Sequence, residues 1–120
     1  MDAFGHVNNA SYLTYLEEAR DEWLAAVLGD GDGLWDFVLA RVAIDFRSEL
    51  TQDDDLVEVR CRLARIGRSS VATREEVVTT DGRLAAEADA VLVARDRESG
   101  SSRPLTDAER AAFEREAAGE

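Results

Sequence analysis

Between Asn9 and about Leu28 the apolar residues recur every three or four positions, which is the spacing of one face of an α-helix. An asparagine at position 8 or 9 is a favourable N-cap, and Gly29 is placed to end the helix. A helix that is apolar over so much of its circumference is expected to be enclosed by other structure. Its remaining, solvent-facing sector is expected to hold the charged residues Glu17, Glu18, Arg20, Asp21 and Glu22.

After the glycine- and aspartate-rich segment 29–33, the apolar period changes to two, which is typical of β-strands. The alternation predicts four strands, around 38–46, 57–63, 69–79 and 83–95. In the first strand one face is expected to carry Val38, Ala40, Val42, Ile44 and Phe46.

The connection between the last two strands contains Asp81-Gly82, which favours a type I′ hairpin turn. The fourth strand carries small residues on one side, at Ala86, Ala88, Ala90 and Ala94. Small side chains in a row let a bulky element approach closely, and the long helix is the simplest candidate.

Pro104, Thr106 and Asp107 are typical helix-start residues, and they predict a short terminal helix over 108–118. No internal repeat or linker divides the chain. We therefore predict one α+β domain over residues 1–120, in which a long helix lies along a β-sheet.

Composition excludes several classes of protein. The net charge is −12, whereas binding to nucleic acid through bulk charge needs a basic surface. The apolar stretches are far shorter than a membrane-spanning helix, and the N-terminus lacks a secretory pattern, so we expect a cytoplasmic protein with no membrane partner. One cysteine and one histidine cannot form a Cys/His metal cluster, and we expect no metal.

All 14 basic residues are arginine, and the chain contains no lysine. An acidic surface of this kind repels itself in dilute buffer, but at about 1 M salt the screening length is only about 3 Å. We interpret the composition as adaptation to a salt-rich cytoplasm. A GC-rich genome, which favours arginine and alanine codons, is the alternative.

The candidate chemistry lies in residues 2–10, immediately before the long helix. This segment contains a carboxylate at Asp2, a glycine and two asparagines. Free N–H groups at a helix N-terminus carry partial positive charge and can stabilise an oxyanion that develops on an attacked carbonyl. An upstream carboxylate can attack that carbonyl or activate a water molecule.

Residues 2–20 read Asp-Ala-Phe-Gly-His-Val-Asn-Asn-Ala-x-Tyr-Leu-x-Tyr-Leu-Glu-x-Ala-Arg. This segment closely resembles the opening of hotdog-fold acyl-CoA thioesterases of the 4-hydroxybenzoyl-CoA thioesterase type. The resemblance continues through 66–70, 81–82, 88–96 and 103–105, so it covers nearly the whole chain. It implies a hotdog fold, in which an antiparallel sheet wraps a long central helix. It also implies an acyl-CoA substrate, no separate cofactor, and a homodimer or homotetramer with each acyl site between subunits.

The resemblance also implies roles for individual residues. Asp2 matches the catalytic carboxylate, as nucleophile or general base, and the backbone N–H groups near Asn9 and Ala10 match the carbonyl-polarising site. His6 and Asn8 match positions that orient Asp2, a water molecule or the substrate. One carboxylate suffices because the CoA thiolate is a good leaving group, with a thiol pKa near 8.5.

Four further residues are candidates for contact with the substrate. Phe4 and Tyr12 are placed to border an acyl pocket, although a tyrosine at helical spacing is also a common core residue. Arg68 and Arg103 are candidates for contact with the CoA phosphates. Asn8 and Asn9 suit a capping role equally well, and Cys61 alternates inward between Val59 and Leu63 as a buried apolar residue.

One departure from the family pattern concerns the start of the chain. Members of the family usually carry a further strand before the motif, whereas here Met1 directly precedes Asp2. We interpret this as a missing first strand, through an internal start, a truncation, or a shortened protein whose sheet edge is completed in another way. A non-catalytic acyl-thioester binding or oligomerisation module is therefore an alternative. A hotdog hydratase or dehydratase is a weaker one, because no Asn-Pro lies between Asp2 and His6.

Overall fold

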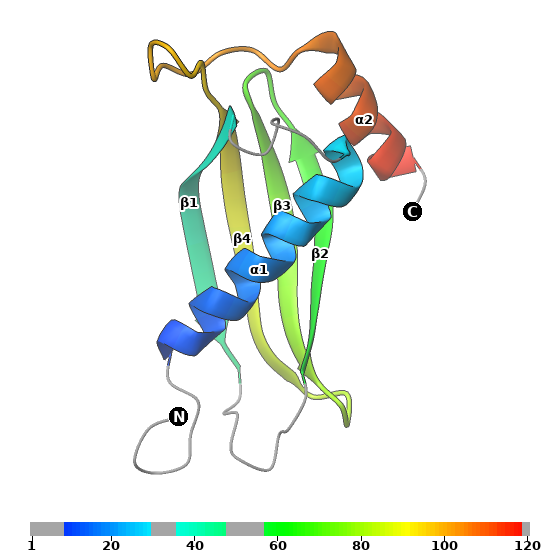
Figure 1. Ribbon diagram of the computed structural model, residues 1–120. Coiled ribbons are helices and arrows are strands. Elements are labelled where there is room, and N and C mark those ends of the chain that lie inside the picture. Colours follow the sequence, from blue (N-terminus) through cyan, green and yellow to red (C-terminus); the bar gives the residue numbers. More distant parts are fainter. Residues whose placement is uncertain (1–8, 30–35, 48–56, 119–120) are drawn as a thin grey trace.

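The computed structural model describes residues 9–29, 36–47 and 57–118 of the chain, and it gives no side-chain description for residues 9–12 (Figure 1). Its elements are α1 (Asn9–Leu28), β1 (Phe37–Phe46), β2 (Val57–Ile66), β3 (Ser70–Thr79), β4 (Leu84–Ala94) and α2 (Asp107–Ala118). The predicted long helix, the four strands and the terminal helix are all confirmed.

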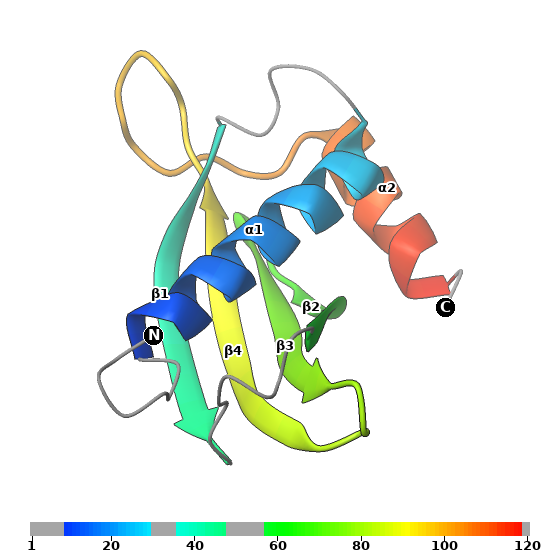
Figure 2. The ribbon, with the colours of Figure 1, turned by 60° about the horizontal axis from the view of Figure 1, so that its bottom comes forward.

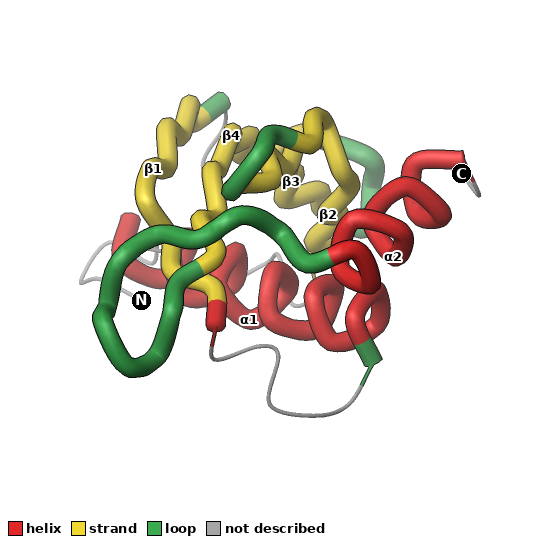
Figure 3. The backbone as a smooth tube through the Cα atoms, turned by 90° about the horizontal axis from the view of Figure 1, so that it is seen from above, coloured by secondary structure: helices red, strands yellow, loops and turns green. Residues whose placement is uncertain are grey.

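The four strands form one antiparallel sheet in the order β1-β4-β3-β2. The long helix α1 crosses one face of this sheet diagonally (Figure 1), and seen from above it forms a separate layer (Figure 3). Its first half lies over β1, and its end lies beside α2 (Figure 2). This is the predicted α+β hotdog arrangement, and it leaves β1 and β2 as the edges of the described sheet.

The sequence prediction for the face of β1 is wrong at its start. The pairing of β1 with β4 shifts between Leu39 and Arg41, so Ala40 is an extra residue in a β-bulge. A bulge reverses the alternation of side chains, which brings Phe37 and Leu39 to the face turned toward α1 in place of Val38 and Ala40. Phe37 is buried in the core, and Leu39 pairs with the core residue Leu92.

The β3–β4 hairpin also differs from the predicted type I′ turn. That turn needs two residues with positive φ, but among the described residues only glycines have one, and here it is Gly82, at +86°. The amide of Gly82 donates to the carbonyl of Thr79 (3.0 Å), and the amide of Thr79 donates to that of Arg83 (2.9 Å). The loop therefore has three residues, and the Thr79 hydroxyl donates to the Asp81 carboxylate inside it.

The core consists of two clusters beneath α1. Under the first half of the helix, Leu16 packs against Ala86 and Ala88 of β4, and this confirms that the alanines admit the helix. Under the second half, the cluster extends to α2, where Phe113 is fully buried. The ring of Trp23 stacks on Phe113 with centroids 6.0 Å apart, and that of Phe37 meets Phe113 edge to face at 6.0 Å.

One charged residue of α1 is not where the sequence analysis placed it. Arg20 was assigned to the solvent sector, but its exposed fraction is 5%. It lies four residues after Leu16 and four before Leu24, which is the spacing of the buried face. Its guanidinium makes two hydrogen bonds to the carboxylate of Glu75 in β3, which is fully buried.

Beside this ion pair, Cys61 faces inward from β2, as predicted. Its Sγ atom lies 4.0 Å from Oε2 of Glu75. Burial and the negative charge of Glu75 raise the pKa of the Cys61 thiol to about 12. The sulfur is therefore a neutral packing atom at physiological pH and not a nucleophile.

Replacing Phe113 by alanine is expected to lower the free energy of unfolding by about 3 to 5 kcal/mol. The reason is that the substitution removes the fully buried ring by which α2 contacts Trp23 of α1 and Phe37 of β1. Urea titration followed by circular dichroism measures this change. The control is Glu114→Ala at the exposed neighbouring position, which is expected to change stability by less than about 0.5 kcal/mol. Equal effects of the two substitutions would contradict the described position of α2.

The thiol of Cys61 is expected to react with Ellman's reagent at pH 8 about a thousandfold more slowly in the folded protein than in urea. The reason is that a rise in pKa from 9.0 to about 12 lowers the thiolate fraction by that factor. The unfolded chain in urea is the internal control. Similar rates in the two states would show that the thiol is neither buried nor beside a carboxylate.

Candidate active site

The described part of the candidate site is the N-terminus of α1. The helix begins at Asn9, so the backbone amides of its first turn have no acceptors within the helix. No acidic side chain lies in that turn. The partial positive charge of the helix end is therefore not offset by a carboxylate within the turn, which suits the binding of a developing oxyanion.

The predicted site residues fall into two groups. Asp2, Phe4, His6 and Asn8 lie outside the described residues, as do the side chains of Asn9, Ala10 and Tyr12. The structure does place Asn9 and Ala10 in the first turn of α1, where the sequence analysis put them. The roles of Asp2, Phe4, His6, Asn8 and Tyr12 stay predictions.

Large apolar side chains are exposed on the side of the molecule formed by α1 and β1. Among the described residues, three large hydrophobic side chains are exposed, and all three lie on α1 or β1: Leu13 (48%), Leu39 (45%) and Phe46 (46%). Because β1 is also an edge strand of the described sheet, this side of the molecule combines exposed apolar side chains with a sheet edge.

A cavity of about 150 Å³ opens between α1, β1 and β4. Its apolar walls are Leu24, Phe37, Leu39 and Leu92, and its charged lining consists of Glu17, Arg20 and Asp21. Burial raises the pKa of the Asp21 carboxyl, and the negative charge of Glu17 adds to the rise. The cavity can therefore take a small apolar group with a guanidinium and two carboxyls at its border.

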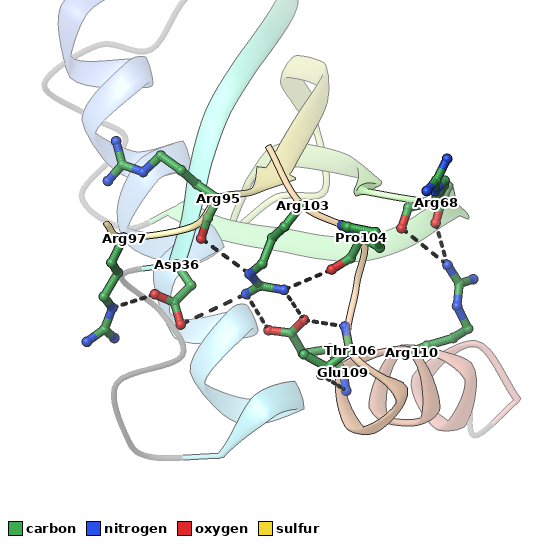
Figure 4. A network of polar contacts seen from close by, with 10 residues as sticks. Asp36, Arg68, Arg95, Arg97, Arg103, Pro104, Thr106, Glu109 and Arg110 are labelled. Atoms are coloured by element: carbon green, nitrogen blue, oxygen red, sulfur yellow. Dashed lines mark hydrogen bonds and ion pairs between the residues drawn. The ribbon is translucent and has the colours of Figure 1, made fainter. Parts of the chain in front are cut away.

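Arg103 is surrounded by partners within the chain (Figure 4). Its Nη1 and Nη2 atoms donate to the two carboxylate oxygens of Glu109 at 2.8 and 3.0 Å. Nε donates to the carbonyl of Arg95, Nη1 also donates to that of Pro104, and the guanidinium lies 5.9 Å from the centroid of the Phe37 ring.

Glu109 belongs to a capping box that starts α2. The amide of Glu109 donates to the hydroxyl of Thr106 (3.1 Å), and the amide of Thr106 donates to the carboxylate of Glu109 (2.9 Å). Burial alone would raise the pKa of Glu109, but the bonds from Arg103 and Thr106 outweigh it and hold the pKa below its ordinary value. In the structure Arg103 thus anchors α2, and its contact with CoA phosphates stays a prediction.

Arg68 lies in the turn between β2 and β3, and its side chain is exposed. Its carbonyl accepts a hydrogen bond from the amide of Leu105 (2.9 Å), and Arg110 donates to the neighbouring carbonyl of Gly67 (2.9 Å). This turn and the segment between β4 and α2, which contains Arg103, lie at the end of the sheet opposite the start of α1 (Figure 1). A single chain therefore does not bring Arg68 and Arg103 to the N-terminus of α1.

The sequence analysis missed the buried pair of Arg20 and Glu75. A signal was present in β3, where Glu75 alternates in phase with the apolar residues Val71 and Val77. A charged residue at an inward position of a central strand requires a partner of opposite charge. Arg20, on the stripe of Leu16 and Leu24, was the candidate within α1.

Two findings bear on other classes of site. Within 9–29, 36–47 and 57–118, no three or more His, Cys, Asp or Glu side chains are grouped so as to hold a metal ion. In the same segments, no helix is both long and apolar enough to cross a membrane.

Comparison with known proteins places the fold and the motif in one family. The sequence profile of the thioesterase-like superfamily matches residues 1–116 of the chain. No curated protein shows significant sequence similarity to the chain.

Solved structures are similar over the whole chain. A thioesterase from Thermus thermophilus, crystallised in complex with coenzyme A and Zn, is 33% identical with a TM-score of 0.86, covering 100% of this chain and 86% of that one. The probable thioesterase YbaW from Escherichia coli is 26% identical with a TM-score of 0.78, covering 97% and 90%. A 1,4-dihydroxy-2-naphthoyl-CoA thioesterase from Synechocystis, 20% identical with a TM-score of 0.79 over 94% and 86%, shares the fold. The chain belongs to the thioesterase-like superfamily.

Proposed function

We propose that the protein is an acyl-CoA thioesterase of the 4-hydroxybenzoyl-CoA thioesterase type, which hydrolyses an acyl-CoA to a carboxylic acid and CoA. One observation carries the proposal. The helix α1 begins at Asn9, directly after the segment from Asp2 to Asn8, and its first turn holds no acidic side chain. A carboxylate that can react with a carbonyl thereby stands seven positions before a helix end that can polarise one. The coenzyme A complex of the Thermus thermophilus relative supports the substrate class.

In the proposed reaction, Asp2 attacks the thioester carbonyl carbon or removes a proton from a water molecule that does so. The carbonyl oxygen takes up negative charge, and the N–H groups near Asn9 and Ala10 stabilise it. The carbon–sulfur bond then breaks, and CoA leaves as a thiolate. If Asp2 is the nucleophile, water hydrolyses the resulting anhydride, and His6 and Asn8 orient the carboxylate or this water.

We further propose that two copies assemble so that the side of α1 and β1 is covered, giving a homodimer or a homotetramer. Leu13, Leu39 and Phe46 are exposed on this side, together with the edge of β1. Pairing two such edges would extend the sheet across both copies and remove apolar surface from water. The start of α1 would then lie near the interface, and a partner could bring Arg68 or Arg103 toward it. The lysine-free surface supports operation in a salt-rich cytoplasm.

Replacing Asp2 by asparagine is expected to lower kcat by about 10² to 10⁴, because the amide can neither attack the thioester nor accept a proton. Thiol release from short, long and aromatic acyl-CoAs in about 1 M KCl, where the screening length is about 3 Å, measures the effect. The control is Asp107→Asn, which makes the same chemical change at an exposed position of α2.

Full activity of the Asp2→Asn variant would remove Asp2 from the mechanism. If the folded wild type binds acyl-CoA but releases no thiol from any substrate of the panel, the proposed enzyme activity is wrong. The chain is then an acyl-thioester binding module.

Replacing Leu39 by aspartate is expected to raise the dissociation constant of the homodimer about a hundredfold, because each of two copies buries a charge in place of a leucine. Light scattering behind a sizing column, over a range of protein concentrations, measures the change. The control is Ala43→Asp, which places the same charge on the opposite face of β1. A wild type that stays monomeric at all concentrations contradicts the proposed assembly.

A further inference from the structure

The carboxylate of Glu75 joins three elements of the fold. It is fully buried in the central strand β3, and it accepts hydrogen bonds from Nε (2.8 Å) and Nη2 (2.6 Å) of Arg20 in α1. The hydroxyl of Thr73, also in β3, donates to Oε2 (2.6 Å), and the Cys61 sulfur of β2 lies 4.0 Å from the same oxygen. This side chain therefore connects α1 with the sheet through directional bonds.

Other contacts that hold α1 on the sheet are of a different kind. These are the apolar contacts, in which the side chains of Leu16, Trp23 and Leu24 pack against the sheet and α2. Such packing is not directional, and a stripe that repeats every three or four residues offers similar contacts after a slip of one turn, about 5.4 Å. The two parallel bonds of a guanidinium with a carboxylate fix both a distance and an orientation.

A slip or rotation of α1 would separate Arg20 from Glu75 and leave two buried charges without partners. A buried ion pair often adds little stability compared with apolar residues of similar volume, but losing one partner is costly. The pair therefore disfavours every placement of the helix except one.

The placement of α1 matters for the proposed chemistry. Asn9 precedes Arg20 by 11 residues, which is about 17 Å along the helix axis. A helix is stiff over this length, so a displacement at Arg20 reaches the first turn. A shift of about 1 Å between an oxyanion and its donors can cost about a hundredfold in rate.

We propose that the buried Arg20–Glu75 pair positions the active site by fixing where α1 lies on the sheet, and thereby where its first-turn N–H groups meet the substrate carbonyl. This inference rests on the proposed thioesterase function. Neither Arg20 nor Glu75 touches the reacting atoms, so both are positioning residues. The alternative role is a purely structural one, in which the pair contributes only to stability.

The test replaces both members by apolar residues of similar length, Arg20→Met with Glu75→Leu. Because no charge is left unpaired, the urea midpoint is expected to stay close to that of the wild type. The kcat for thioester hydrolysis is expected to fall about tenfold or more, whereas KM changes less than about threefold, because the misplaced N–H groups act chiefly in the transition state. A matched control removes an exposed pair of β2 in the same way, Arg60→Met with Glu58→Leu, and is expected to leave kcat unchanged.

A conservative variant separates geometry from charge. Arg20→Lys keeps a positive charge opposite Glu75 but lacks the planar fork, so its kcat is expected to lie between those of the wild type and the double variant. If the double variant does not fold, the kcat of Arg20→Lys tests the proposal in its place. A value equal to that of the wild type overturns the proposal.

A second measurement does not depend on activity. In a crystal structure of the double variant, or of Arg20→Lys if the double variant does not fold, α1 is expected to be displaced along its axis or rotated relative to β3. If α1 is unmoved, or if kcat of a folded double variant stays within about twofold of the wild type, the proposal is wrong. If the wild type itself releases no thiol, the proposed function has failed, and the position of α1 alone decides whether the pair fixes the helix.

Discussion

A carboxylate without access to water decides how the layers of this protein meet. Glu75 lies in the middle of the sheet, on the face turned toward α1, and burying its charge there is unfavourable unless a cation and hydrogen-bond donors accompany it. Arg20 supplies two donors and Thr73 a third. The small side chains of Ala86 and Ala88 let Leu16 of the helix pack closely on β4.

The two ends of α1 are controlled by different interactions. Its start carries the first-turn backbone amides on which the proposed chemistry depends, near the side of β1 where Leu39 and Phe46 are exposed. Its other end packs on α2, where Trp23 stacks on Phe113. The terminal helix is held in turn by its capping box and by Arg103, which donates to Glu109 and to two backbone carbonyls. A residue that the sequence suggested for substrate binding thus contributes to the architecture behind the site.

Periodicity was sufficient to predict the elements of the fold, because a period of 3.6 or two is a property of each segment alone. The prediction from periodicity was wrong where a single residue changes the alternation of side chains or the length of a turn. The bulge at Ala40 moves Leu39 to the face of the sheet that α1 covers, where it is still partly exposed. The Thr79 hydroxyl helps to form a three-residue turn where Asp-Gly favours a two-residue one. The burial of Arg20 was missed because its charge was given more weight than its four-residue spacing from Leu16. The roles of Asp2 and His6 came from resemblance to a family, since a catalytic role is a relation between side chains that no periodic pattern contains.

The distribution of ion pairs bears on the acidic, lysine-free surface. Arg60 with Glu58 lies on exposed strand positions, and Arg97 with Asp36 is exposed on the arginine side, so salt screens both pairs. The pair of Arg20 and Glu75 is enclosed by α1, β2 and β3, and ions cannot enter between its atoms. At about 1 M salt, where the screening length is about 3 Å, the exposed pairs lose most of their attraction and the buried pair keeps its own. Among the ion pairs of the described residues, the contact that places the helix on the sheet is therefore one that high salt weakens far less than the exposed pairs.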